Sequence, residues 1–187
     1  MIVRAATSAD IPALNDLIAA SVRQLSAGFY TLPQIEAALK CVFGVDSQLI
    51  EDGTYFIIDG DAGPAAAGGW SGRRTLYGGD QTKDTNDPRL DPRTEPARVR
   101  AFFVHPTHVR RGLARQLYDE CERAARAAGF RQFELVATLP GEPLYLSLGF
   151  RVEERIILTP AGVAVPFARM SRSIAIASDA VASSPTR

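Results

Sequence analysis

Apolar and polar positions in the first half of the chain predict a strand, two helices and a hairpin. Residues 2–5 form a short apolar run, and helix-capping residue types then precede apolar positions spaced three and four residues apart. Pro33 opens a second periodic stretch that closes at Gly44, as expected for a helix with proline near its start and glycine after its end. Beyond Gly53, two runs of β-forming residues flank the turn Asp59-Gly60-Asp61, which indicates a hairpin.

The second half of the chain begins with a polar stretch and then alternates strands with helices. Residues 78–96 are rich in proline, glycine and charge, so we expect an exposed loop there. Apolar bulk from Arg98 to Val104 predicts a strand, and the amphipathic pattern after His108 predicts a long helix that ends at Gly129. Further elements are expected at residues 133–138 (strand), 142–147 (helical turn), 149–158 (strand) and 163–174 (strand).

Length and composition favour a single domain with no net charge at pH 7. A chain of 187 residues suffices for one well-buried core, and we predict a single domain over residues 1–174 followed by a disordered polar tail over residues 175–187. The 21 Lys and Arg residues balance the 21 Asp and Glu residues, so the net charge gives no indication of nucleic-acid or membrane binding. The two cysteines lack metal-ligand spacing, and no apolar run resembles a signal peptide or a membrane span. We therefore expect a cytoplasmic protein without a metal site.

The strand-to-helix connection at residues 104–115 carries the clearest chemical signal. A helix start exposes unpaired backbone N–H groups and the positive end of the helix dipole, which together bind anions such as phosphate. Gly112 would let the backbone approach phosphate oxygens closely, while Arg110, Arg111 and Arg115 add positive charge. A solvated basic helix end, in which Gly112 only bends the chain, explains the same residues equally well.

Two motifs in this region resemble those of the GCN5-related N-acetyltransferase superfamily. The first, Val109-Arg110-Arg111-Gly112-Leu113-Ala114, resembles the family pattern Gln/Arg-x-x-Gly-x-Gly/Ala at the start of the helix after the fourth strand, although Val109 departs from its first position. The preceding Val104-His105-Pro106 is also typical of the family. The second motif, from Tyr145 to Phe150, resembles the family segment Tyr-x-x-x-Gly-Phe. The resemblance covers residues 97–155 well.

The resemblance implies both a fold and a reaction. The fold is a mixed α/β arrangement, the acyl-CoA N-acyltransferase fold, in which a mostly antiparallel sheet of about seven strands is splayed at its fourth strand and carries helices on both faces. The reaction is direct transfer of an acetyl group from the co-substrate acetyl-CoA to a primary amine. The acceptor is a small molecule or a peptide that the sequence does not identify, and a homodimer is possible because dimers are common in the family.

The resemblance also implies which residues bind the coenzyme. The pantetheine arm would lie beside the fourth strand and bond to its backbone as an added strand would. The phosphates would lie on the helix start. The residues assigned to coenzyme binding are Phe102, Phe103 and Val104 for the arm and Val109, Arg110, Arg111, Gly112, Leu113, Ala114 and Arg115 for the phosphates.

Tyr145 matches the position at which many family members place the acid that protonates the departing thiolate. A tyrosine holds its proton at pH 7, so the donation is chemically reasonable. A tyrosine packed in the core with its hydroxyl group satisfied is the alternative. The backbone N–H of about Val104 could stabilise the oxyanion that forms during transfer.

The general base is not identified by the sequence. Family members often place Glu, His or an ordered water near the fourth strand, where this chain has Arg98 and Arg100, which cannot act as bases. These two arginines either point into the acceptor cleft and favour an anionic substrate, or bridge to the acidic loop as exposed strand residues. The base candidates left open are Glu51, Asp52, Glu95, His105 and His108, and the residues that could line the same cleft are Tyr30, Trp70, Arg73, Arg74 and Tyr77.

Two other functions remain open at this point. A protein with the same fold that binds acetyl-CoA without catalysis, as a sensory or interaction module, would explain the missing acidic residue. A nucleotide-binding enzyme could use the same helix start, but the chain contains neither a Gly-x-x-x-x-Gly-Lys-Ser/Thr loop nor a Gly-x-Gly-x-x-Gly turn.

Overall fold

The computed structural model describes residues 2–82 and 86–174. Within these residues one sheet has the strand order β1-β2-β3-β4-β5-β7-β6, and its only parallel pair is β4 with β5. The strands are β1 Val3–Ala5, β2 Tyr55–Gly60, β3 Gly63–Ser71, β4 Ala97–Val104, β5 Gln132–Thr138, β6 Arg151–Leu158 and β7 Val165–Ser173. The α-helices are α1 Ile11–Leu25, α2 Leu32–Cys41, α3 Ser47–Glu51, α4 Leu113–Ala127 and α5 Glu142–Ser147. The mixed α/β fold predicted from the sequence is confirmed.

Short 3₁₀ turns complete the described chain, and one of them, η2, directly precedes α4. They are η1 Ser8–Asp10, η2 Pro106–His108 and η3 Pro160–Gly162. The sequence pattern did not indicate these turns or α3, because a segment of three to five residues is too short to show a helical period. Instead, α3 is held at its start by Asp46, whose side chain accepts a hydrogen bond from the Gln48 backbone N–H at 3.1 Å.

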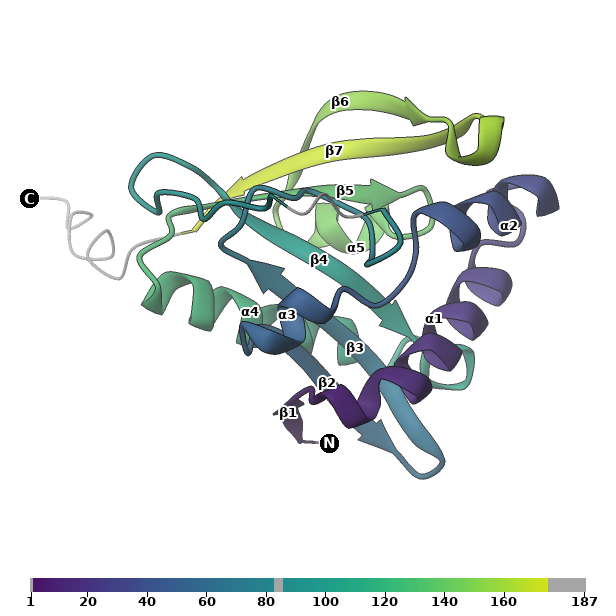
Figure 1. The fold of residues 1–187 in the computed structure, drawn as a ribbon, viewed down its shortest axis with the longest axis horizontal. Coiled ribbons are helices and arrows are strands. Elements are labelled where there is room, and N and C mark those ends of the chain that lie inside the picture. The colour runs from purple at the N-terminus through teal and green to yellow at the C-terminus, as the bar shows by residue number, and fades with distance from the viewer. Residues whose placement is uncertain (1, 83–85, 175–187) are drawn as a thin grey trace, which may run out of the picture.

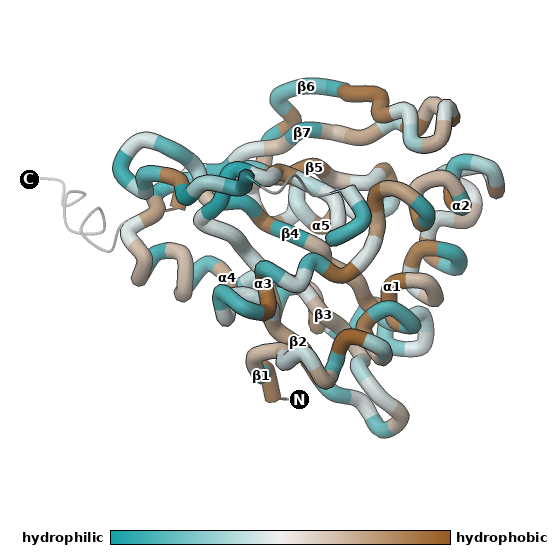
Figure 2. Tube along the Cα trace, viewed as in Figure 1, coloured by the Kyte–Doolittle hydropathy of each residue, from teal (hydrophilic) through white to brown (hydrophobic). Residues whose placement is uncertain are grey.

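Helices cover both faces of the sheet and define two apolar cores (Figure 1). One core lies against α4 and α5, where Leu117 and Cys121 of α4 pack with Phe133 of β5. The other lies against α1 and α2, where Leu14 and Ile18 of α1 pack with strand residues from the opposite face. In Figure 2 the loop between β3 and β4 is largely hydrophilic, whereas hydrophobic segments lie in the strands and the helices that face them. Apolar residues on both faces of the central strands are therefore buried under helices.

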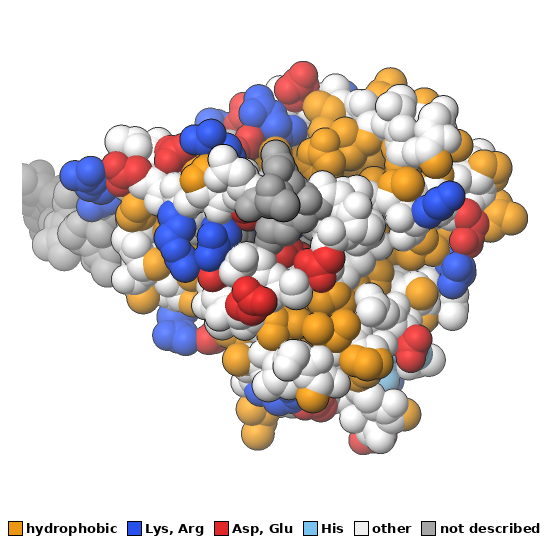
Figure 3. Space-filling model, viewed as in Figure 1, with side chains coloured by type: hydrophobic (Ala, Val, Ile, Leu, Met, Phe, Trp, Pro, Cys, Tyr) orange, Lys and Arg blue, Asp and Glu red, His pale blue; other side chains and the backbone are white. Residues whose placement is uncertain are grey.

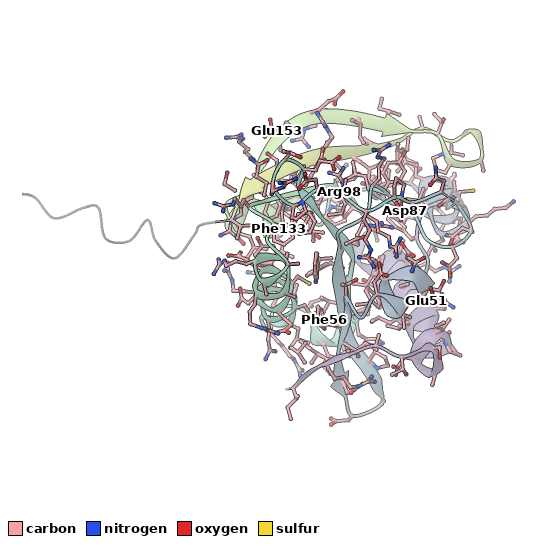
Figure 4. The ribbon with its side chains drawn as sticks, turned by 60° about the vertical axis from the view of Figure 1, so that its left-hand side comes forward. Glu51, Phe56, Asp87, Arg98, Phe133 and Glu153 are labelled. Carbon is pink, nitrogen blue, oxygen red and sulfur yellow. The ribbon has the colours of Figure 1, made fainter. Side chains whose placement is uncertain are left out.

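Strands β4 and β5 separate after a short paired segment. They are paired only at Ala97 with Phe133 and Arg98 with Glu134, although β4 continues to Val104 and β5 to Thr138. Figure 1 shows β4 running away from β5 toward its C-terminal end, and Figure 4 labels Arg98 and Phe133 where the two strands are still together. The splayed fourth strand implied by the family resemblance is present.

An irregularity in β4 accompanies this separation. The register against β3 shifts between Ala67, opposite Phe103, and Gly69, opposite Arg100. Two β4 residues thus oppose one β3 residue, and Ala101 lies in the left-handed region at φ 53°. Such a bulge bends its strand and redirects the neighbouring side chains. The sequence gives no sign of it, because alanine is not a residue type that favours positive φ.

The polar loop over residues 78–96 is less exposed than its composition predicted. Leu90 is 6% exposed and belongs to the core beside α4, and its N–H donates to the Gly72 carbonyl at 2.8 Å. Most other described residues of the loop are exposed or partly exposed, as expected. The expectation of an exposed loop was therefore wrong at Leu90, since a single leucine is enough to anchor a loop whose composition is otherwise polar.

The tail predicted to be disordered, residues 175–187, lies outside the described residues. None of the helices in residues 2–82 and 86–174 combines the length and the apolar character required to cross a membrane. Both cysteines are free thiols, Cys41 at the end of α2 and Cys121 buried in α4.

Candidate active site

A cavity of about 610 Å³ occupies the gap between β4 and β5. Its lining runs along β4 from Val99 to Val104, crosses to residues 136–138 of β5, and includes residues from the start of α4 and from α5. The structure brings nearly all of the predicted site residues together here. The lining includes Phe102, Phe103, Val104, Val109, Arg110, Gly112, Leu113, Ala114, Arg115 and Tyr145, while Arg111 is exposed and outside it.

The start of α4 is open and uncapped. Gly112, the residue before the helix, has φ 77° and ψ 6° and supplies no side-chain cap. The backbone N–H groups of residues 110–115 donate to no backbone carbonyl within the described chain. A Cβ atom built on Gly112 would have no protein atom within 4 Å beyond its chain neighbours, so the space beside this glycine is open. The arrangement presents several N–H donors and the helix dipole to one anion-sized space.

Arg110, Arg111 and Arg115, beside this helix start, are exposed to solvent. Arg110 has φ 62°, another left-handed residue next to the turn. Arg115 bonds weakly to the Ser147 carbonyl of α5 at 3.3 Å, which joins the two helices that border the cavity. Guanidinium groups in such positions bind phosphate bidentately. We infer that the geometry can bind a diphosphate group.

The backbone of β4 turns toward the gap at Val104. The His105 N–H donates to the Ala65 carbonyl of β3 at 2.8 Å, and Val104 lies opposite Ala66 in the antiparallel register. Because N–H groups alternate in direction along a strand, the Val104 N–H points away from β3 toward the cavity. The Phe103 side chain, 9% exposed, packs in the core beside α1 and borders the cavity from that side.

Phe102 and Tyr145 close the opposite wall of the gap. Their ring centroids lie 6.4 Å apart in an edge-on arrangement, and the Tyr145 ring also meets Phe150 at 5.7 Å. A Cβ atom on Gly68 would lie 2.7 Å from the Phe102 ring, so a glycine is needed in β3 for this ring to lie flat against the sheet. Burial raises the pKa of the Tyr145 hydroxyl group above the usual tyrosine value. Tyr145 therefore keeps its proton at neutral pH and borders the cavity.

The base candidates are distributed around the molecule rather than gathered in the cavity. The Asp52 carboxylate is bonded to Arg73 at 2.6 Å, which lowers the pKa of Asp52, and the Glu95 carboxylate accepts a hydrogen bond from the Asp91 backbone N–H. Of the five candidates only His108 lines the cavity. Its ring is bonded to the Thr107 hydroxyl group at 2.9 Å and lies close to Gly60 in the β2–β3 turn.

Arg98 and Arg100 are both engaged in ion pairs within the protein. Arg98 pairs with Glu134 of β5. Arg100 is 3% exposed and pairs with Asp46 at 2.9 Å, and it also donates to the Thr75 and Gly78 carbonyls at 2.8 and 2.7 Å. Arg100 borders the cavity, but its charge is compensated. These contacts favour structural roles over recognition of an anionic substrate.

The remaining lining residues come from segments that sequence reasoning did not connect. They are contributed by the end of α1, by residues 42–44, by residues 76–78, and by Leu158 and Phe167 at the β6–β7 end of the sheet. Of the cleft residues proposed from the sequence, only Tyr77 lines the cavity. Three of the other proposed cleft residues make contacts outside the cavity lining. The Tyr30 hydroxyl group donates to the Pro166 carbonyl, the Trp70 ring packs on Phe130, and Arg73 pairs with Asp52.

Comparison with known proteins agrees with this geometry. Residues 52–152, more than half of the chain, match the family model described as an acetyltransferase (GNAT) domain. A search of curated proteins gave no significant match.

Several solved structures share the fold at low sequence identity. A GCN5-related N-acetyltransferase from Rhodopseudomonas palustris is 19% identical, with a TM-score of 0.67 over 92% of this chain and 94% of that one. The PaiA N-acetyltransferase from Thermoplasma acidophilum, solved with coenzyme A, is 13% identical, with a TM-score of 0.62 over 92% and 98%. YncA from Salmonella typhimurium, a putative acetyltransferase solved with acetyl-CoA, is 17% identical, with a TM-score of 0.61 over 100% and 98%.

The match to the family model, the splayed sheet and the uncapped helix start lead to one assignment. The chain belongs to the GNAT acetyltransferase family.

Proposed function

We propose that this protein transfers an acetyl group from acetyl-CoA directly to a primary amine of an acceptor. The observation that carries the proposal is the continuity of one cavity, which runs from the uncapped start of α4 along the unpaired edge of β4 to Tyr145. Family membership and the coenzyme-bound structures with the same fold give independent support.

The residues present fit the coenzyme on two grounds. The free N–H groups of residues 110–115 offer donors for a diphosphate, with Arg110 and Arg115 beside them. Beyond Arg98, the side of β4 that faces β5 is not paired with β5. Backbone groups on that side can therefore bond to the amide groups of a pantetheine arm. When bound, acetyl-CoA supplies the acetyl thioester that reacts with the amine.

Two groups of the chain then act on the reacting atoms. The Val104 N–H, which points into the gap, donates a hydrogen bond to the carbonyl oxygen where negative charge develops. The Tyr145 hydroxyl group donates its proton to the departing sulfur. The aromatic contacts of Tyr145 with Phe102 and Phe150 hold its ring in place for this transfer.

A two-part experiment tests the proposal. The protein is titrated calorimetrically with acetyl-CoA, and free thiol is measured with a thiol-reactive dye when acetyl-CoA and single primary amines are mixed with the protein. We expect saturable binding and thiol release that requires both protein and amine. Absence of binding to folded protein contradicts the proposal entirely.

A non-catalytic acetyl-CoA-binding module is the second candidate. It is favoured by the lack of any Asp or Glu among the described residues that line the cavity. Tight binding of acetyl-CoA without thiol release from any amine would support this candidate over the first.

A further inference from the structure

The wall of the cavity on the side of α1 and α2 is built almost entirely from apolar side chains. We call it the acceptor wall, and it consists of Val22, Leu25, Phe43, Leu76, Phe103 and Phe167. Phe43 meets Phe103 at 5.9 Å and Phe167 at 6.2 Å, both edge-on, so three aromatic rings form one surface. Figure 3 shows apolar side chains at several places on this face of the molecule, among charged ones. The wall therefore favours an apolar, preferably aromatic, ligand.

The segments that carry the acceptor wall are tied to one another by polar contacts behind it. The Asp80 N–H donates to the Val45 carbonyl at 3.0 Å, and the Gln81 side chain donates to the Phe43 carbonyl at 3.0 Å. Arg100 holds the Thr75 and Gly78 carbonyls. The residues at 42–44 and 76–78 are thus fixed relative to β4, and the wall is preformed.

No uncompensated charge faces the ligand along this wall in the described part of the chain. None of the described lining residues is Asp or Glu. The one arginine near the wall, Arg100, is compensated by Asp46, whose side chain is 1% exposed. Ser21, Ser26 and Tyr77 contribute hydroxyl groups to the lining, which carry no charge at neutral pH.

This distribution of charge bears on the protonation state of the acceptor. An ammonium group that enters an apolar space loses its hydration and needs a carboxylate in return, which the described lining does not offer. The same lining offers no carboxylate to remove the ammonium proton before attack, and its imidazole, that of His108, is bonded to Thr107 through Nδ1 and places Nε2 beside Gly60 at the end of β2. An amine that arrives uncharged requires neither, because its nitrogen lone pair is already free.

We propose that the acceptor is an apolar amine that is uncharged at neutral pH, an aromatic amine being the simplest case. This inference rests on the proposed function and adds the chemical class of its acceptor. The amine nitrogen forms the new C–N bond with the acetyl carbon, and the C–S bond breaks with its electron pair on sulfur. Once the C–N bond has formed, nitrogen releases one proton to water, and the tyrosinate left after Tyr145 protonates sulfur takes one proton back from water, so the products are a neutral amide and a thiol.

Two amines of similar size and different charge test the proposal. Aniline is uncharged at pH 7, whereas benzylamine is an ammonium ion, and spermidine extends the comparison to a polycation. With saturating acetyl-CoA we expect kcat/KM for aniline to exceed that for benzylamine by about tenfold or more at pH 7. The rate with aniline should change little between pH 6 and pH 8, while that with benzylamine should rise about tenfold per pH unit as free amine appears. A preference for benzylamine or spermidine at pH 7 overturns the proposal.

A single carboxylate placed in the acceptor wall should reverse this selectivity. Leu25, partly buried at the end of α1, lines the cavity, whereas Leu32 is 69% exposed at the start of α2 and does not. We expect Leu25→Glu to lower kcat/KM for aniline about tenfold and to raise the ratio of benzylamine to aniline activity. Leu32→Glu is the matched control and should leave both values unchanged. Equal effects of the two substitutions contradict the assignment of the wall.

A binding measurement separates failure of this inference from failure of the proposed function. Methyl NMR spectra of the protein with coenzyme A are recorded while aniline is added. If the Val22 and Leu25 methyl signals shift but no amine is acetylated, the apolar ligand site is supported and the proposed acetyl transfer is contradicted. If other amines cause thiol release while aniline neither binds nor reacts, acetyl transfer is supported and the proposal of an apolar, uncharged acceptor is contradicted.

Discussion

The proposed coenzyme side and the proposed acceptor side of the cavity are built in different ways. The coenzyme side comes mostly from one continuous stretch, residues 102–115, with Tyr145 of α5 added. The acceptor wall is assembled from α1, residues 42–44, residues 76–78, β4 and β7, which are far apart along the chain. On the first side the groups offered to a ligand are largely backbone N–H groups, and on the second they are side chains.

This difference has a consequence for how each side tolerates substitution. A backbone donor is present whatever the side chain, so the coenzyme side depends on conformation at a few positions such as Gly112. The acceptor wall depends on the volume and charge of many side chains and on the contacts that hold their segments together. One side is suited to a ligand shared by many proteins, and the other to a ligand particular to this one.

The largest expected effect comes from removing the buried cation behind the acceptor wall. Arg100→Met removes the guanidinium group that pairs with buried Asp46 and should lower the free energy of unfolding by about 3–5 kcal/mol. It also releases the Thr75 and Gly78 carbonyls, so the acceptor KM should rise while the acetyl-CoA Kd stays unchanged. Denaturant unfolding, steady-state kinetics and calorimetry measure the three quantities.

Two further variants sharpen this test. The double variant Arg100→Met/Asp46→Asn removes both charges and keeps an oxygen at the start of α3, so it should recover stability but not acceptor KM. Arg98→Met on the same strand breaks a pair with Glu134, which keeps its bond to Arg169. The Arg98 variant should leave acceptor KM unchanged, and a rise equal to that of Arg100→Met would contradict the link between Arg100 and the wall.

The next largest effect is expected at Tyr145, where the two sides meet. Tyr145→Phe removes the proposed acid and should lower kcat about 100-fold with little change in the acetyl-CoA Kd. Because burial raises the pKa of Tyr145, the hydroxyl group stays protonated through the ordinary range of tyrosine titration. We therefore expect the kcat of the unaltered protein not to fall between pH 8 and pH 10 (about the usual tyrosine pKa). Full activity of Tyr145→Phe across this range would remove its assigned role.

A smaller effect is expected from a side chain at the helix start. Gly112→Val forces a β-branched residue to φ 77° and places methyl groups before the free amides, so acetyl-CoA affinity should fall about tenfold. Gly53→Val is the matched control, because Gly53 has φ 68°, has no atom within 4 Å of a built Cβ and lies outside the cavity. Both should lose about 1–2 kcal/mol of stability. Equal losses of affinity would mean that strain, rather than the blocked amides, explains the result.

The same contrast explains how far the sequence could be used for prediction. The strands, the longer helices and the coenzyme side follow from local patterns: periodicity, the glycine before α4 and a motif within six residues. The assignment of residues 102–115 and Tyr145 to coenzyme binding and catalysis stays a prediction, because the structure contains no ligand.

The features that the sequence did not predict depend on contacts between residues far apart along the chain. The bulge at Ala101, the pairing of Arg100 with Asp46, and the meeting of Phe43 with Phe167 join positions that share no local signal. Tyr30 and Trp70 show the reverse error, since aromatic residues expected in the cleft are used by the core. The type of a side chain alone does not show whether it points toward the core or toward the cleft.

The most direct test of the account is an amide NMR titration of the protein with acetyl-CoA. If the uncapped start of α4 and the open edge of β4 hold the coenzyme, the largest shifts should fall on the N–H groups of residues 110–115 and Val104. Amides of the β1–β2 edge should barely move. Shifts confined to other parts of the chain, or none at millimolar acetyl-CoA, would contradict the account.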